Sequence, residues 1–147
     1  MENKIDCVML IDDHHPTNVL HNLIIENCSC TNKIVTFDNG QDALEYLYQP
    51  FGITHPKPNI IFLDINMPGM SGWDFVDAYK QLPKYVKLDT LLFMLSTSSH
   101  PEDIKRAEME TVIKDYIYKP LTEEVMKHLV KKNITKLKKT GSLFSKN

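Results

Sequence analysis

The sequence predicts an α/β protein built on a doubly wound parallel sheet of five strands with five helices. Five short apolar segments recur along the chain, and a segment with helical periodicity follows each of them. Strands that alternate with helices in this way pair in parallel through right-handed crossovers, which puts helices on both faces of the sheet. The 147 residues suffice for one such domain, and we expect no second domain within them.

The predicted strands are short apolar or β-branched runs that end at polar or turn-forming residues. The third run leads directly into Asp64 and then into a turn rich in Pro and Gly, which is typical of a buried parallel strand. The five strands are expected at residues 6–11, 33–37, 59–63, 90–95 and 115–118.

The predicted helices carry apolar residues three or four positions apart, and each begins at residues that suit a helix start. These starts are Pro16, residues 38–40, Ser71, a capping box of Ser99 and Glu102 around Pro101, and Thr122. The positions that define the helical faces are Val19, Leu20, Leu23, Ile24 and Cys28 in the first helix, Ala43, Leu44, Leu47 and Tyr48 in the second, Phe75, Val76 and Tyr79 in the third, and Val125, Met126, Leu129, Val130, Asn133, Ile134 and Leu137 in the fifth.

Composition indicates a soluble globular protein, with 42% hydrophobic and 24% charged residues and no apolar run of membrane-spanning length. The N-terminus lacks the pattern of a signal peptide, so we predict a cytoplasmic location. The three cysteines are an odd number, and the spacing of Cys28 and Cys30 fits neither a redox CxxC motif nor a zinc site. We therefore expect reduced thiols.

Charge is distributed unevenly along the chain. Residues 119–147 contain eight Lys and two Glu, whereas residues 1–118 contain 9 basic and 17 acidic residues. Lys without interleaved Arg or aromatic residues favours a solvated face over binding to nucleic acid or a membrane. We expect a domain core at about residues 5–138 and a flexible basic tail at residues 139–147.

Polar residues follow the predicted strands at the points where those strands end. Asp12 and Asp13 follow the first strand, Asp64 the third, Ser96 and Thr97 the fourth, and Lys119 the fifth. The carboxyl ends of parallel strands share one edge of the sheet, so these side chains should converge there. Clustered carboxylates repel unless a cation lies among them, and oxygen ligands without His or Cys indicate Mg²⁺. With Lys119 and a hydroxyl, this set suits a phosphoryl group attacked by a carboxylate.

These motifs resemble those of the receiver domains of two-component response regulators, the CheY-like family. The resemblance covers residues 5–138 and rests on the Asp12–Asp13 pair, the segment 63–72, the hydroxyl after the fourth strand, and the segment 116–120. It implies a flavodoxin-like sheet with strand order 2-1-3-4-5. It also implies a stand-alone, single-domain response regulator, which is a signalling protein rather than an enzyme.

The resemblance further implies a role for each site residue. Asp64 would be the phosphoacceptor and Lys119 would contact the phosphoryl group. Asp13 and Asp64 would bind Mg²⁺ directly, together with the main-chain carbonyl of Asn66, and Asp12 would act through water. The Lys119–Pro120 bond resembles one that is cis in this family.

Two departures from the family pattern are visible. Ser96 and Thr97 offer two hydroxyls where one is usual, and we favour Ser96 because it directly follows the apolar run. Residues 111–114 replace the usual Gly-Ala pair, so the turn before the fifth strand should differ from the usual turn of the family. The Pro-rich loop 49–58 resembles an insertion in regulators that are partners of phytochrome-type or hybrid kinases.

The leading hypothesis is a phosphorelay switch that receives a phosphoryl group from a histidine kinase or phosphotransfer protein. Phosphorylation would move the strand-four hydroxyl and Tyr116, and would strengthen binding to a downstream target or a second copy through the fourth helix, fifth strand and fifth helix. The alternative is a Mg²⁺-dependent phosphohydrolase of the haloacid-dehalogenase type, which needs a second acid where this chain has Asn66. A DNA-binding regulator would need a longer segment after the fifth helix.

Overall fold

A five-stranded parallel sheet forms the centre of the computed structural model, which describes residues 4–133. The strand order is β2-β1-β3-β4-β5, and all neighbouring strands are parallel, which confirms the predicted fold class. The bounds differ from the predicted ones by at most two residues. The strands are β1 (Ile5–Ile11), β2 (Thr31–Phe37), β3 (Ile60–Leu63), β4 (Leu91–Ser96) and β5 (Ile113–Tyr118).

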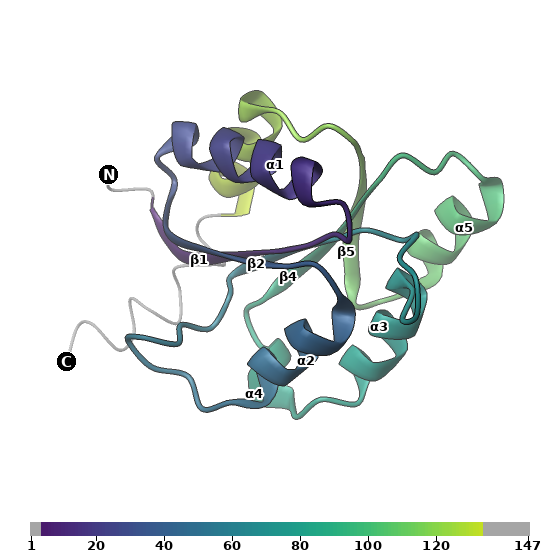
Figure 1. The fold of residues 1–147 in the computed structure, drawn as a ribbon, viewed down its shortest axis with the longest axis horizontal. Helices are drawn as coiled ribbons and strands as arrows, with labels where there is room; N and C mark the ends of the chain where they lie inside the picture. Colours follow the sequence, from purple (N-terminus) through teal and green to yellow (C-terminus); the bar gives the residue numbers. More distant parts are fainter. Residues whose placement is uncertain (1–3, 134–147) are drawn as a thin grey trace.

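Helices cover both faces of this sheet (Figure 1). On one face lie α1 (His15–Cys28) and the helical residues 123–133, and on the other lie α2 (Gly40–Tyr48), α3 (Gly72–Lys80) and α4 (Lys84–Lys87). The remaining helix, α5 (Pro101–Met109), lies at the β5 end of the sheet. The sequence prediction missed α4, because a single turn of four residues after Pro83 has no apolar periodicity to reveal it.

Two apolar clusters fill the spaces between the sheet and its helices. One contains Met9 and Ile11 with side chains of α2 and α3, and the other contains Val8 and Leu10 with Ile25 and side chains of residues 121–130. Successive residues of a strand point to opposite faces, so β1 contributes alternately to both clusters. This explains why its central residues, like all of β3, are apolar without alternation.

The predicted inward face of α1 is wrong. Val19, Leu20 and Leu23 are 46%, 46% and 53% exposed, whereas Asn18, His21 and Ile25 are buried. Positions 18, 21 and 25 form a stripe at helical spacing that is rotated away from the apolar one. The amide nitrogen of Asn18 and the Nε2 of His21 have specific hydrogen-bond partners, which offset part of the cost of burial, whereas the buried Oδ1 of Asn18 has no partner among the described residues.

The start of α5 also differs from the prediction. The N-cap residue is His100, which makes no side-chain capping bond, so Ser99 and Glu102 form no capping box. Instead the hydroxyl of Ser98 donates to a carboxylate oxygen of Asp103 at 2.7 Å. A contact within the loop therefore takes the place of the predicted cap.

Other predicted helix starts are confirmed. Ser71 and Asp74 form a capping box at α3, and the side chain of Asn39 accepts the Asp42 N–H at α2. Thr122 accepts the N–H of Val125 at the start of the helical residues 123–133. The predicted inward positions Ile134 and Leu137, like the basic tail, lie outside the described residues.

The loop 49–58 is held by contacts within itself and with α2. The main chains of Gly52 and His55 exchange two hydrogen bonds, and the His55 ring stacks on Tyr46 with ring centroids 3.7 Å apart. The turn before β5 is short, since α5 ends at Met109 and β5 begins at Ile113, and the pairing of β5 with β4 contains a register shift between Leu92 and Phe93.

Candidate functional site

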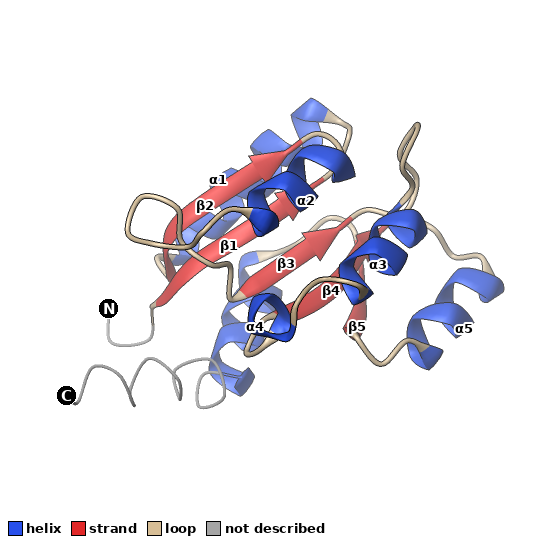
Figure 2. Cartoon of the chain, turned by 90° about the horizontal axis from the view of Figure 1, so that it is seen from below, coloured by secondary structure: helices blue, strands red, loops and turns tan. Residues whose placement is uncertain are grey.

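The carboxyl ends of the strands bring the predicted site residues together. The arrowheads of β1, β2 and β3 in Figure 2 point toward the same edge of the sheet, and β4 and β5 run parallel to them. Asp12 directly follows β1, Asp64 follows β3, Ser96 ends β4 and Lys119 follows β5. Carboxylate oxygens of Asp12, Asp13 and Asp64 lie within 4.8 Å of one another, which confirms that the three acids converge.

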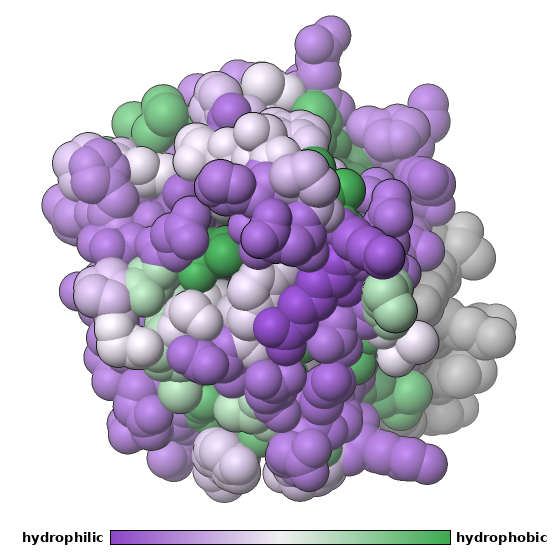
Figure 3. All heavy atoms as spheres, turned by 90° about the vertical axis from the view of Figure 1, so that its right-hand side faces the viewer, coloured by the Kyte–Doolittle hydropathy of each residue, from purple (hydrophilic) through white to green (hydrophobic). Residues whose placement is uncertain are grey.

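The side of the molecule drawn in Figure 3 is largely hydrophilic, with small separate hydrophobic areas.

Lys119 supplies positive charge to this cluster. Its Nζ atom lies 2.5 Å from Oδ2 of Asp12 and 3.1 Å from Oδ1 of Asp64, and all three side chains are largely buried. Burial lowers the pKa of Lys119, but the two carboxylates outweigh this effect and hold its pKa above the usual value. Lys119 is therefore a fixed cation at the site.

The cluster still carries uncompensated negative charge. Burial and then the neighbouring charge of Asp12 raise the pKa of the Asp64 carboxyl, and Lys119 opposes this shift only in part. Both oxygens of Asp12 have partners, because Oδ1 accepts the main-chain N–H of His14 at 2.9 Å and Oδ2 contacts Lys119. The side chain of Asp13 is exposed. Three carboxylates with one lysine fit a hard divalent cation such as Mg²⁺, whose charge would relieve their repulsion.

The turn after Asp64 is packed closely against the start of α3. The N–H of Gly72 donates to the Ile65 carbonyl at 2.7 Å, and a Cβ atom at Gly72 would lie 2.3 Å from the carbonyl oxygen of Asp64. Only a residue without a side chain fits this approach. Asp64 is further fixed because its main-chain N–H donates to the Ile11 carbonyl at 3.0 Å.

The two candidate hydroxyls after β4 differ in exposure. Ser96 is fully buried and its Oγ accepts the N–H of Ser98 at 3.1 Å, whereas the Thr97 side chain is exposed. Tyr116 is half-buried on the neighbouring strand β5, and its hydroxyl donates to the Ser98 carbonyl at 2.7 Å. Burial raises the pKa of Tyr116, which keeps this phenol protonated as a donor at neutral pH.

Sequence reasoning missed several residues that link the site to α5. Ser98 bonds to Ser96 and Tyr116 through its main chain and to Asp103 through its hydroxyl. Asp103 also accepts the indole N–H of Trp73 at 2.9 Å. Burial alone would raise the pKa of Asp103, but these hydrogen bonds lower it below the usual value. The pattern of Ser98 with Asp103 matches no capping signature, so the sequence gives no signal for it.

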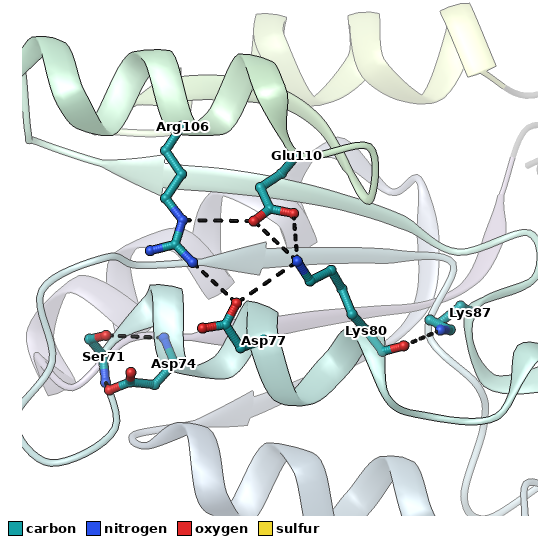
Figure 4. A network of polar contacts seen from close by, with 7 residues as sticks. All are labelled: Ser71, Asp74, Asp77, Lys80, Lys87, Arg106 and Glu110. Atoms are coloured by element: carbon teal, nitrogen blue, oxygen red, sulfur yellow. Dashed lines mark hydrogen bonds and ion pairs between the residues drawn. The ribbon is translucent and has the colours of Figure 1, made fainter.

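Charged side chains hold α5 against α3 (Figure 4). Arg106 contacts Asp77 at 3.1 Å, and Lys80 contacts Glu110, just after α5, at 3.1 Å. The Arg106 guanidinium also lies over the Trp73 ring, 4.5 Å from its centroid. Ala107 is the one buried residue of α5 itself. Partly exposed ion pairs each contribute about 0–1 kcal/mol, so α5 is held more weakly than a helix with an apolar face.

Known proteins share the sequence pattern and the fold of this chain. A family model described as the response regulator receiver domain matches residues 8–131. The structure is similar to that of a two-component response regulator from Cytophaga hutchinsonii, with 35% sequence identity, a TM-score of 0.79, and coverage of 90% of this chain and 98% of that chain.

Two curated relatives differ in the share of their own length that this chain covers. The response regulator Rcp1 of Synechocystis is 25% identical over 113 residues, which are 76% of this chain and 75% of Rcp1. A probable cyclic di-GMP phosphodiesterase of Vibrio cholerae is 27% identical over 147 residues, but this chain spans only 31% of its length. Within residues 4–133, no helix is long and apolar enough to span a membrane. The chain belongs to the family of response regulator receiver domains.

Proposed function

We propose that this receiver domain is a phosphorelay switch in which Asp64 accepts the phosphoryl group. The observation that carries this proposal is the position of the Asp64 carboxylate, which lies within 4.8 Å of the other two acids and 3.1 Å from the Lys119 ammonium. Asp64 directly follows β3, the strand between β1 and β4, so it is central among the other side chains of the cluster.

In the proposed reaction, a carboxylate oxygen of Asp64 attacks the phosphorus of a phosphohistidine. The P–N bond of the donor breaks, an acyl phosphate forms on Asp64, and the electron pair remains on the imidazole. Lys119 stays within reach of the phosphoryl oxygens and offsets their charge. Bound Mg²⁺ would supply further positive charge to the same oxygens.

Asp13, Asp64 and the main-chain carbonyl of Asn66 are the proposed direct ligands of Mg²⁺. The free side chain of an exposed Asp13 supports this assignment, and the two occupied oxygens of Asp12 support its action through water. We expect weak binding, because only two carboxylates, one carbonyl and waters would hold the ion. Asp13→Ala tests the assignment, because it should lose Mg²⁺ binding. Titration with Mg²⁺ while Trp73 emission is recorded measures this loss.

The phosphoacceptor is tested by incubation with Mg²⁺ and phosphoramidate, followed by mass spectrometry of the modified peptide. Asp64→Asn keeps the shape of the side chain and removes the nucleophile, so we expect no uptake. Asp6→Asn, at an exposed position on β1, should behave as the wild type. Undiminished uptake by Asp64→Asn would show that another residue is the acceptor.

We propose Ser96 rather than Thr97 as the hydroxyl that responds to the phosphoryl group. Its burial beside the strand end and its bond to the Ser98 N–H support this choice, and the Tyr116 bond to Ser98 supports a coupled movement of that ring. Beryllofluoride, a phosphoryl mimic, should change the surroundings of Tyr116 in the wild type and in Thr97→Ala. If Thr97→Ala abolishes the change and Ser96→Ala does not, the choice between the hydroxyls is wrong.

The proposed phosphodonor is a histidine kinase or phosphotransfer protein, including the phytochrome-type or hybrid kinases. The exposed apolar residues Val19, Leu20 and Leu23 of α1 support docking of a donor helix, because α1 begins three residues after Asp12. Leu23→Ser should slow transfer from a phosphorylated histidine phosphotransfer protein and leave labelling by phosphoramidate unchanged. Equal rates with the protein donor would exclude this surface.

The proposed output surface consists of α5, β5 and residues 123–133, and it binds a downstream protein or a second copy of the chain. Exposure of Met109 and Tyr118 and the weak attachment of α5 support this surface. Beryllofluoride should strengthen self-association or target binding by about 5 to 150-fold, measured by sedimentation.

We also propose a cytoplasmic location for the protein. The free thiols of Cys7, Cys28 and Cys30 support it.

A further inference from the structure

The buried face of α1 contains two polar side chains. Asn18 is 3% exposed and His21 is 1% exposed, and they are one helical turn apart. Burying a polar group is costly unless it forms hydrogen bonds, so the partners of such groups show what holds them there. In this helix the partners belong to two different segments of the site.

Asn18 contacts the segment that carries the acidic pair. Its amide Nδ2 donates to the main-chain carbonyl of Asp12 at 2.7 Å and to that of Phe37 at 3.3 Å. The Asp12 N–H also donates to the Phe37 carbonyl at 3.1 Å. Two carbonyl acceptors fix the orientation of the amide, since only its NH₂ group can serve both. The amide therefore ties together the ends of β1 and β2 where the acidic pair begins.

His21 contacts the segment that carries Lys119. Its Nε2 accepts the main-chain N–H of Leu121 at 3.2 Å, and Leu121 is fully buried two residues after Lys119. An accepting Nε2 carries no proton, so the imidazole is neutral. Burial, followed by the nearby charge of Lys119, lowers the pKa of His21, which keeps it neutral at pH 7.

We propose that Asn18 and His21 are positioning residues, through which α1 sets the acidic pair and Lys119 at their working distance from each other. The inference rests on the proposed phosphorylation of Asp64. The two contacts have separate consequences, because Asn18 holds the main chain of the acidic pair expected to serve Mg²⁺, whereas His21 holds the segment of the lysine expected to meet the phosphoryl group. Groups that orient a ligand through hydrogen bonds typically change metal affinity about 10 to 100-fold when removed.

The test compares Asn18→Leu and His21→Leu in the full chain, using two measurements. Mg²⁺ affinity is followed by Trp73 emission, and the phosphorylation rate is measured with phosphoramidate at saturating Mg²⁺. Asn18→Leu should weaken Mg²⁺ binding about 10-fold. His21→Leu should keep Mg²⁺ binding within a factor of about two but lower the phosphorylation rate about 10-fold, because a displaced catalytic group loses rate steeply.

Two controls separate positioning from loss of folding. Ile25→Val alters the same buried face without touching the site, so it should change neither measurement. In a Lys119→Ala background, His21→Leu should cause no further loss of rate, since the lysine that it positions is gone. An undiminished effect in that background would assign His21 a merely structural role and overturn its part of the inference.

A second pair of variants applies if His21→Leu does not fold. The amide oxygen of Gln reaches the position of Nε2, whereas the shorter Asn does not, so His21→Gln should keep the wild-type rate and His21→Asn should lose it. Equal rates for these two variants would also overturn the inference. If the wild type is phosphorylated at Asp64 and both Leu variants match it in both measurements, the inference alone fails. If the wild type takes up no phosphoryl group, the proposed function fails.

Discussion

The indole N–H of Trp73 on α3 donates to the carboxylate of Asp103 on α5 at 2.9 Å. The same carboxylate accepts the hydroxyl of Ser98, whose main chain contacts both Ser96 and Tyr116. The only tryptophan of the chain is thus joined through hydrogen bonds to the end of β4 at the site. A change at Ser96 therefore has a direct route to a fluorescent side chain.

We expect Asp103→Ala to destabilise the protein by about 1 kcal/mol and to change Trp73 emission, because two donors lose their acceptor. Urea unfolding measures the first effect. Glu102→Ala is the matched control, since Glu102 is exposed in the same first helical turn, and removing either acid costs the same interaction with the helix dipole. Equal stabilities of the two variants would contradict a role for the Trp73–Asp103–Ser98 contacts.

Lys119→Ala should destabilise the protein by about 3–5 kcal/mol in EDTA, because Asp12 and Asp64 remain buried without their cation. Mg²⁺ should restore part of this loss by binding only the folded state. Lys127→Ala removes an exposed pair with Glu123 and should cost no more than about 0.5 kcal/mol, with no response to Mg²⁺. A Lys119→Ala protein as stable as the wild type in EDTA would refute this ion-pair account.

Gly72→Ala should slow phosphorylation and lower the free energy of unfolding by about 1–3 kcal/mol, because the new methyl group meets the Asp64 carbonyl. The shift of that carbonyl displaces the acceptor side chain. Gly52→Ala is the control, because a Cβ atom at Gly52 has no neighbour within 4 Å. If both variants react with phosphoramidate at the wild-type rate, the close approach of Gly72 does not position Asp64.

The buried His21 should make the stability depend on pH. Burial and then Lys119 lower its pKa in the folded state below 6.5, while Asp12 acts in the opposite direction. As the pH falls below about 6.5, the unfolded chain binds a proton at this residue before the folded one does, so the free energy of unfolding decreases. The contribution is fully present above that pH.

Urea unfolding between pH 7.5 and pH 5 measures this dependence. His21→Gln has no titratable group at this position, so its stability should decline less steeply than that of the wild type over the same range. Asn27→Gln, at an exposed position of α1, adds and removes no titratable group, so it is the control and should follow the wild type. Identical slopes for His21→Gln and the wild type would contradict the lowered pKa.

The sequence alone predicted the alternation of strands and helices and the convergence of Asp12, Asp64 and Lys119. Both follow from rules that depend on local pattern, since apolar runs indicate buried strands and all strands of a parallel sheet end at one edge. The buried state of Ser96 also follows locally, because it continues the apolar run of β4. Capping at Ser71 and Thr122 depends only on residues three positions away.

The tertiary structure decided which face of α1 is buried and what holds α5. The apolar stripe of Val19, Leu20 and Leu23 predicted the wrong face, because the carbonyl of Phe37 and the N–H of Leu121, which bond to Asn18 and His21, are distant in the sequence. Likewise Ser98 bonds to Asp103 rather than leaving Ser99 to cap the helix, and Trp73 reaches Asp103 from another helix. Periodicity describes how apolar a face is, but the burial of a polar side chain depends on partners that only the folded chain brings within hydrogen-bonding distance.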